Sequence, residues 1–224
     1  MKPITVHHLN NSRSQRVLWL LEELGLPYEI QRYERDPKTM LAPPELRRVH
    51  PLGKSPVITE GKLTLAESGA ILEYLVDRHG QGRFKPTDEA DLLRYRYFMH
   101  FAEGSAMPPL LLKLIFDKVA SAPMPFFAKP IAKGIAAKVL GTVVQPNIDA
   151  QLKFLEAELA SRPWFAGAEF SAADVQMSFP LEAAAARGGS MAAYPKLREF
   201  LARIHARPAY QRALERGGPY ELLR

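Results

Sequence analysis

The sequence predicts a small α/β unit with a mixed sheet over residues 1–80, a linker over 81–87 and an all-helical unit over 88–224. Strand-like and helix-like hydrophobic patterns alternate as far as Gly80, after which the strand pattern disappears. The stretch "GQGRFKPTDEAD" then gathers glycine and proline, which are typical of a linker. A chain of 224 residues and 25.1 kDa has room for two such domains.

The first three elements of the α/β unit read as strand, helix and strand. Residues from Ile4 to Leu9 have strand character. Apolar residues between Val17 and Leu24 recur at the spacing of one helix face, and Gly25 and Pro27 end that helix. Residues from Tyr28 to Tyr33 alternate well enough for a second strand.

A short helix, a hairpin and a closing helix complete this unit. The short helix fits Pro44 to Val49. The segment "SPVITEGKLTLAES" holds two short strands separated by Glu60-Gly61, which indicates a hairpin. A further helix opens at Ala70 and stops at Gly80. This order of elements makes a complete α/β unit.

Everything after Asp88 reads as helix and connecting loop. An aromatic-rich helix runs to the Pro108-Pro109 pair, where a bend is expected, and the pattern then continues to Val119. Residues 121–130 contain three prolines and form a loop, after which helical periodicity resumes as far as Leu159.

One helix start in this second half is strongly specified by the segment "EFSAADVQMS". Ser171 can cap the helix while Asp174 reaches back, a capping box in which Asp replaces the usual Glu or Gln. We interpret this box as a local stabiliser of the helix, worth about 1 kcal/mol.

Composition excludes several classes of function. The chain has no cysteine, so disulfide frameworks, thiolate metal sites and a catalytic cysteine are excluded, and any thiol chemistry must use a thiol from elsewhere. His7, His8 and His100 show no metal-ligand spacing with carboxylates, so no metal site is expected. The first residues, "MKPITVHHLN", lack the apolar core of a signal peptide. We expect a cytoplasmic protein.

No run approaches the roughly 18 apolar residues of a membrane span, so none is expected. The formal net charge of +6 is concentrated in the second half, where five lysines between residues 113 and 138 face only Asp117. Such a cluster can attract nucleic acid or anionic lipid. No arginine-rich or aromatic-interleaved motif accompanies it, so we interpret it as a solvated helix face and expect no nucleic-acid partner.

Several motifs together resemble the cytosolic glutathione S-transferase superfamily. These are the β-α-β-α-β-β-α order, "HPLGKSPVI", "LAESGAI", the helical second half and "FAGAEFSAADV". The segment "HFAEGSAMPPLLLKLIF" further resembles a bacterial and fungal subgroup of that superfamily. The resemblance implies a thioredoxin-like N-terminal domain that binds glutathione and an all-helical C-terminal domain that binds a hydrophobic electrophile.

The resemblance implies a glutathione site at the hairpin and the helix that follows it. Ser68 would hold the γ-glutamyl carboxylate at a helix N-terminus, while Glu67 accepts from the γ-glutamyl amine. Pro56 would be cis, so that the backbone of Ser55 pairs with the cysteinyl unit like an added strand. Lys54 would meet the glycine carboxylate. Taken alone, Ser68 reads better as a helix cap and Glu67 as a solvated acid, while Lys54 reads almost equally well as an exposed loop lysine.

The thiol-activating residue is expected in the polar run between the first strand and the first helix. A transferase must lower the pKa of a bound thiol, and a hydroxyl donor and a helix N-terminus both favour the thiolate. We predict Ser12 as the thiolate donor, Asn11 as the second candidate and Arg13 as a source of positive charge. Ser12 also begins a capping box with Gln15, and Ser14 falls in the first helical turn.

Tyr97, Phe101 and Met107 are the candidates for the hydrophobic electrophile site, although aromatic residues at helical spacing are more often core. In some relatives an acid in this helix reaches the glutathione of a neighbouring subunit, and Glu103 has the corresponding place. The resemblance also implies a homodimer.

The leading function is conjugation of glutathione to small hydrophobic electrophiles in detoxification, with glutathione as co-substrate and no metal. Glutathione-dependent reduction of organic peroxides is an alternative, because the same thiolate performs it. A non-catalytic module that binds ligands or partners is a second alternative, which the absence of a standard activating tyrosine at Asn11 leaves open.

Overall fold

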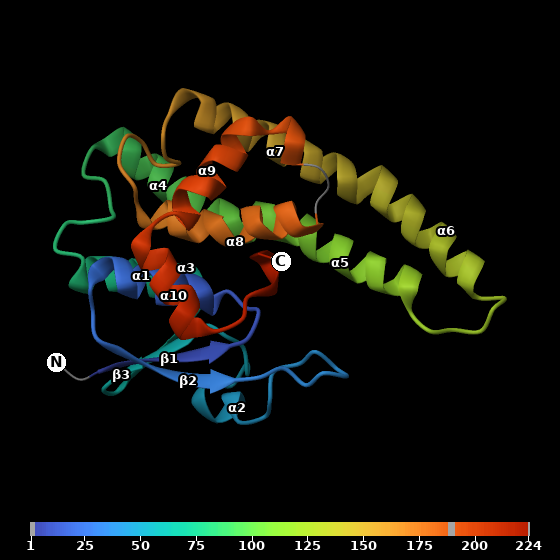
Figure 1. The fold of residues 1–224 in the computed structure, drawn as a ribbon, viewed down its shortest axis with the longest axis horizontal. Coiled ribbons are helices and arrows are strands. Elements are labelled where there is room, and N and C mark those ends of the chain that lie inside the picture. Colours follow the sequence, from blue (N-terminus) through green and yellow to red (C-terminus); the bar gives the residue numbers. More distant parts are fainter. Residues whose placement is uncertain (1–2, 188–190, 224) are drawn as a thin grey trace.

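The computed structural model describes residues 3–187 and 191–223. Figure 1 shows a small α/β unit beside a larger body of helices, from which α5 and α6 extend as an arm. A four-stranded mixed sheet with helices precedes a mostly helical half, which confirms the predicted fold class. No helix in the described ranges is both long and apolar enough to cross a bilayer.

The sheet has the strand order β2-β1-β3-β4. Strand β1 (Ile4–Leu9) pairs in parallel with β2 (Tyr28–Tyr33) and antiparallel with β3 (Val57–Glu60). Strand β4 (Leu63–Ala66) completes the predicted hairpin with β3. A parallel pair needs a crossover, which α1 (Ser14–Leu24) supplies. The polar run of residues 10–13 therefore lies where β1 enters α1.

Helix α1 is buried on all sides because it lies between the sheet and the helical half. Every residue from Ser14 to Leu21 is buried, including three polar ones. Gly25 ends the helix in the left-handed conformation with φ of 69°, as its position predicts. Helix α2 (Leu46–Val49) is one turn long, and α3 (Ser68–His79) packs beside α1. In Figure 1, α2 lies on the opposite side of the sheet from α1.

The helical half contains seven α-helices in the described residues: α4 (Glu89–Phe101), α5 (Met107–Ser121), α6 (Lys129–Val139), α7 (Gln145–Ser161), α8 (Ala172–Arg187), α9 (Pro195–His205) and α10 (Pro208–Gly217).

 Helix α8 is the centre of this half, since every residue from Ala172 to Ala184 is buried.

The expected irregularity near Pro108-Pro109 lies one turn earlier than predicted. A π-helical segment, η1 (Ala102–Ala106), separates α4 from α5, and the two prolines occupy the first turn of α5. Proline is tolerated in a first turn because the N–H groups there have no helical partner. The loop expected over 121–130 is shorter, because α5 runs to Ser121 and α6 begins at Lys129. A second π-helical segment, η2 (Leu140–Val144), joins α6 to α7.

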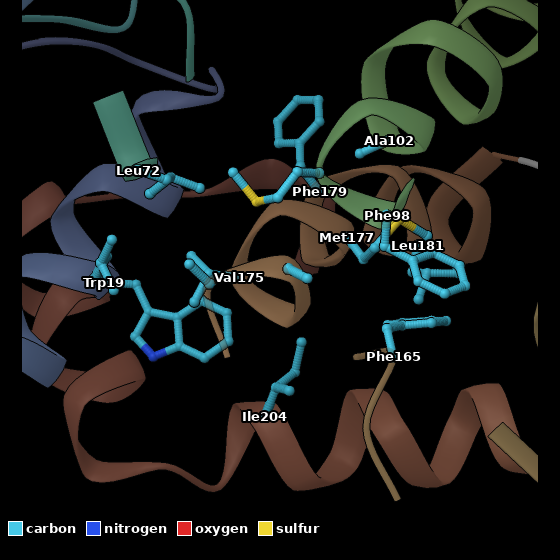
Figure 2. Packing of buried hydrophobic residues seen from close by; sticks show 14 of the residues in the cluster. Trp19, Leu72, Phe98, Ala102, Phe165, Val175, Met177, Phe179, Leu181 and Ile204 are labelled. Atoms are coloured by element: carbon cyan, nitrogen blue, oxygen red, sulfur yellow. The ribbon is translucent and has the colours of Figure 1, made fainter. Parts of the chain in front are cut away.

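The hydrophobic core runs continuously from the sheet into the helical half (Figure 2). Trp19 of α1 is fully buried and packs edge-on against Tyr210 of α10, with ring centroids 5.1 Å apart. Leu72 of α3 and Val175 of α8 belong to the same cluster. The two halves are therefore packed on each other through α1. Their division into domains at residues 80 and 88 stays a prediction, although α3 ends at His79 and α4 begins at Glu89.

The two predicted capping boxes have different outcomes. Ser171 Oγ accepts from the Ala173 N–H at 3.3 Å, and Asp174 accepts from the Ser171 N–H at 2.9 Å, which confirms the box of α8. The box between Ser12 and Gln15 forms only in part: Ser12 Oγ accepts from the Ser14 N–H at 3.3 Å, but among the described residues the Gln15 side chain makes no return hydrogen bond to Ser12. Gln15 is buried against Gly217 of α10, so tertiary packing directs its side chain away from the helix start.

Candidate functional site

A cleft of about 640 Å³ lies between the α/β unit and the start of α5. It is lined by seven of the residues singled out from the sequence, which come from positions up to 90 residues apart: Arg13, Lys54, Ser55, Pro56, Glu67, Ser68 and Glu103. Its size falls within the usual range for small-molecule sites, about 300–1,000 Å³. The structure thus brings the predicted polar residues into one cavity.

The turn before β3 forms one wall of this cleft. The Ser55-Pro56 peptide bond is cis, as the resemblance implies. Ser55 Oγ donates to the His7 carbonyl at 2.9 Å and accepts from the Leu9 N–H at 3.3 Å, so the side chain ties the turn to β1. The backbone N–H and C=O of Ser55 take part in none of the backbone hydrogen bonds between described residues. They are therefore available to an extended peptide.

The N-terminus of α3 forms the opposite wall. Glu67 is exposed and has a left-handed φ of 71°, and Ser68, the first residue of α3, is buried. The Ser68 Oγ accepts from Arg16 at 3.2 Å and from Gln176 at 3.4 Å. With both bonds accepted, the Ser68 hydroxyl proton remains for an acceptor in the cleft. Helix N–H groups at this end add a partial positive charge suited to a carboxylate.

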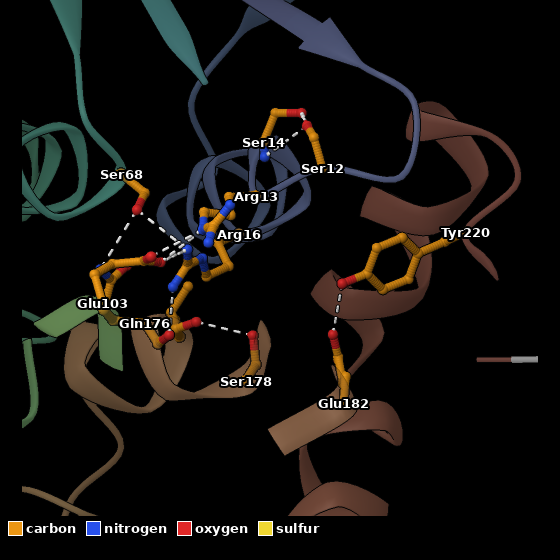
Figure 3. A network of polar contacts seen from close by, with 11 residues as sticks. Ser12, Arg13, Ser14, Arg16, Ser68, Glu103, Gln176, Ser178, Glu182 and Tyr220 are labelled. Carbon is orange, nitrogen blue, oxygen red and sulfur yellow. Dashed lines mark hydrogen bonds and ion pairs between the residues drawn. The ribbon is translucent and has the colours of Figure 1, made fainter. Parts of the chain in front are cut away.

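Two arginines of α1 and its N-terminal turn connect this wall to a carboxylate of the helical half (Figure 3). Arg13 Nε donates to both Glu103 oxygens at 2.9 Å, and Arg16 donates to Glu103 as well. The Arg16 side chain is 1% exposed and also donates to the Gln176 carbonyl at 2.6 Å. Burial acts to raise the pKa of Glu103, but the charges of Arg16 and Arg13 outweigh it and lower that pKa. Glu103 is therefore ionised, and both arginines that it pairs with belong to its own chain.

Ser12 is buried next to Ser55, which lines the cleft, and belongs to a chain of hydroxyl groups. Its Oγ is 2.7 Å from Ser14 Oγ and 3.4 Å from Ser55 Oγ, and Ser14 Oγ is 2.8 Å from His8 Nδ1. Burial, and then the charge of Arg32, lower the pKa of His8 to about 4, so the ring is neutral at pH 7.

The direction of the protons in this chain follows from the second contact of His8. The ring also hydrogen-bonds to the backbone of Gly217, which favours the tautomer whose Nδ1 accepts. Ser14 then donates to His8 and accepts from Ser12. The Ser12 proton points toward Ser14 in the absence of a stronger acceptor, and a thiolate in the cleft would compete for it.

Asn11 has a different set of contacts. Its backbone has a left-handed φ of 49°, and its Oδ1 accepts from the Glu221 N–H at 2.8 Å. Tyr220, next to Glu221, donates to the buried Glu182 of α8 at 2.8 Å (Figure 3). Asn11 therefore ties the turn before α1 to the C-terminal segment, and neither it nor Ser12 lines the cleft.

The three candidates for the electrophile site do not line this cleft either. Tyr97 stacks on Phe101 with centroids 5.5 Å apart, and Phe101 also contacts Phe154 of α7. Phe101 and Met107 are buried, and Tyr97 is 49% exposed on α4. The large apolar residues that line the cleft and are exposed are three leucines: Leu41, Leu52 and Leu111.

Comparison with known proteins identifies the family. Two family models match, "Glutathione S-transferase, N-terminal domain" over residues 12–78 and "Glutathione S-transferase, C-terminal domain" over residues 135–208. The chain is 39% identical over 218 residues to glutathione S-transferase 3 of Schizosaccharomyces pombe, across 95% of this chain and 87% of that relative. The chain belongs to the glutathione S-transferase superfamily.

Solved glutathione S-transferases have the same fold. The crystal structure of one from Actinobacillus pleuropneumoniae is similar with a TM-score of 0.81 and 33% identity, over 99% of this chain and 96% of that one. A glutathione transferase family member from Pseudomonas fluorescens, solved with two glutathione molecules bound, has a TM-score of 0.73 and 27% identity, over 96% of this chain and 93% of that one.

Three residues at the candidate site of this glutathione S-transferase escaped prediction from the sequence. Arg16 and Gln176 reach Ser68 from α1 and α8, and Ser14 joins Ser12 to His8. The available signal was an arginine next to the apolar stripe that begins at Val17, since an arginine on a buried face needs a partner. No cluster of three or more His, Cys, Asp or Glu able to hold a metal ion occurs among residues 3–187 and 191–223.

Proposed function

We propose that this chain binds glutathione in the cleft and conjugates its thiolate to small hydrophobic electrophiles. The observation that carries the proposal is the convergence of a cis-proline turn, a helix N-terminus and separate acidic and basic groups in one cavity. Glutathione has two carboxylates, an amine, a thiol and a peptide backbone, and each finds a complementary group there. The glutathione-bound relative of the same fold supports this assignment.

The proposed pose follows from these groups. The γ-glutamyl carboxylate accepts from Ser68 and the first N–H groups of α3, while Glu67 accepts from the γ-glutamyl amine. The cysteinyl unit pairs with the free backbone of Ser55 in the manner of an added strand. Lys54, exposed at the rim, meets the glycine carboxylate. This pose places the thiol near the β1–α1 turn.

Thiol activation is assigned to the Ser12 hydroxyl. Ser12 Oγ lies 3.4 Å from Ser55 Oγ, beside the turn that holds the cysteinyl unit. A thiolate is a stronger acceptor than the Ser14 hydroxyl, so the Ser12 O–H turns to the sulfur and lowers the pKa of the thiol. Asn11 is the weaker candidate, because its Oδ1 already accepts from Glu221. The positive charge of Arg13 at the cleft surface acts in the same direction.

The reaction needs no covalent enzyme intermediate. The thiol loses its proton to solvent, and the thiolate sulfur attacks the electrophilic carbon to form a carbon–sulfur bond. In a substitution, the leaving group departs with the electron pair of the bond that breaks. Leu41, Leu52 and Leu111 would contact the apolar part of the electrophile, because they are the exposed leucines of the cleft. A role for Tyr97, Phe101 and Met107 stays a prediction.

We also propose that the protein is a cytoplasmic homodimer. Leu93 and Tyr97 of α4 are 68% and 49% exposed, and they lie one turn apart on the helix. An apolar pair on one helix face suits a subunit contact. Light scattering tests the oligomeric state, and a 25 kDa particle at micromolar concentration would contradict the dimer.

Three assays separate the candidate activities. The protein should bind to immobilised glutathione and be released by free glutathione. It should then conjugate glutathione to chlorodinitrobenzene, with a leaving chloride, faster than the uncatalysed reaction. Activity with cumene hydroperoxide instead would indicate a peroxide reductase, which the same thiolate would serve. Binding without either activity would indicate a non-catalytic module, and failure to bind glutathione would refute the assignment.

A further inference from the structure

The arm formed by α5, the connecting loop and α6 exposes a large amount of apolar surface. Figure 1 shows that the far ends of the two helices extend away from the rest of the chain. Phe126 and Phe127, in the loop at the tip, are 88% and 66% exposed. Further exposed apolar side chains lie along both helices: Leu111, Leu112, Ile115, Val119, Ile131 and Ile135.

These side chains follow the periodicity of each helix. Leu111, Ile115 and Val119 are spaced four residues apart on α5, and Ile131 and Ile135 have the same spacing on α6. Residues at this spacing lie on one helix face, so each helix carries an apolar stripe that leads to the tip. More than half of the exposed large apolar side chains of the described chain lie on this arm, and a patch of this kind indicates an interaction surface.

The charges of the arm have one sign. Between Glu103 and Asp149, the charged residues are five lysines and the single Asp117, which pairs with Lys113 at 3.1 Å. The other four are exposed and have no ion pair within the described chain: Lys118, Lys129, Lys133 and Lys138. Lys129 is two residues beyond the Phe126-Phe127 pair, and Lys138 is on the same face of α6 as Ile131 and Ile135.

The exposed apolar side chains of the arm and the unpaired lysines near them suit one kind of partner best. A nucleic acid would use the lysines but leave the phenylalanine and isoleucine side chains in water. A second copy of this arm would bring like charges together. An anionic bilayer surface satisfies both, because aromatic side chains enter the headgroup region while lysines meet lipid phosphates and carboxylates.

We propose that the α5–α6 arm docks this protein on anionic lipid surfaces, with Phe126 and Phe127 inserted among the headgroups. This inference stands independently of the glutathione chemistry, because none of the lysines or phenylalanines of the arm lines the cleft. Leu111 belongs both to the cleft and to the apolar stripe of α5.

Vesicle sedimentation tests the docking directly. The full chain should sediment with vesicles of phosphatidylcholine and phosphatidylserine, much less with phosphatidylcholine alone, and should be released by high salt. Phe126→Ser/Phe127→Ser should weaken binding at least about tenfold through lost apolar burial. Lys129→Gln/Lys133→Gln/Lys138→Gln should weaken it by about a hundredfold, at about fivefold per lysine.

Matched controls carry the same changes away from the arm. Lys38→Gln/Lys62→Gln/Lys153→Gln removes three exposed lysines elsewhere and should bind vesicles like the parent protein. Met40→Ser removes an exposed apolar residue of the α/β unit and should do the same. Failure of the parent chain to sediment, or equal loss in arm and control variants, would overturn the proposal. So would conversion of a dimer to a monomer by the phenylalanine variant without lipid, which would make this face a subunit interface.

Discussion

Replacing Glu103 by glutamine should destabilise the protein through Arg16. Glu103 is the carboxylate partner of two arginines, and the Arg16 side chain is 1% exposed while Arg13 is 34% exposed. Removing one partner of a buried ion pair costs about 3–5 kcal/mol, because it leaves an uncompensated charge. The Glu103 side chain is 33% exposed, and the glutamine oxygen still accepts from Arg16. We therefore expect a loss of about 2 kcal/mol in the free energy of unfolding, below that range.

Urea unfolding followed by circular dichroism measures this loss. The matched control is Arg13→Gln, which removes the more exposed partner of the same carboxylate and should cost less than about 1 kcal/mol. Because Arg16 also holds Ser68 Oγ, Glu103→Gln should weaken glutathione binding in calorimetry as well. A cost for Glu103→Gln no larger than that of Arg13→Gln would refute the view that the buried arginine depends on Glu103.

Three further predictions concern the cleft and its surroundings. Ser12→Ala should raise the pKa of the bound glutathione thiol by about 1–2 units, read from thiolate ultraviolet absorbance, since a hydrogen bond to a charged group contributes about 1.5–3 kcal/mol; a larger rise in Asn11→Ala would move the role there. Glu67→Gln should weaken glutathione binding about tenfold in calorimetry, and unchanged affinity would contradict the γ-glutamyl site. His8 takes up a proton near pH 6.5 when the chain is unfolded but only near pH 4 when it is folded. The stability that the neutral ring gives the fold is therefore fully present above pH 6.5 and is lost as the pH falls toward 4. The parent protein should lose about 3 kcal/mol more than His8→Gln between pH 7 and pH 4 in urea unfolding, and equal losses would disprove this.

Most elements of the α/β unit were predictable from the sequence, because each has a local cause. The strand from Ile4 to Leu9 and the strand from Tyr28 to Tyr33 have the bounds that were predicted. Gly25 ends α1 because it adopts a conformation that other residues avoid. The irregularity near Pro108 was predicted at the wrong turn, since proline signals only that a helix is interrupted and the π-helical segment needed the surrounding packing.

The candidate site was predictable where a motif carries its own local geometry. The cis bond at Pro56 and the place of Ser68 at a helix N-terminus were predicted through the family resemblance that these short motifs carry, and both residues line the cleft; the local pattern alone placed the start of α3 two residues late, at Ala70. Tyr97 and Phe101 carried no such geometry, and helical spacing alone did not distinguish a ligand wall from the aromatic cluster in which they lie.

The sequence by itself determined the order and class of the elements, the absence of a thiol in the chain and the family resemblance, because these depend on residue type and short-range spacing. Only the tertiary structure decided the partners of the polar side chains. Arg16 meets Gln176 across 160 residues, and Asn11 meets Glu221 across 210 residues. Such contacts depend on how α1, α8 and the C-terminal segment pack together, and no local pattern specifies a partner that folding brings from the other end of the chain.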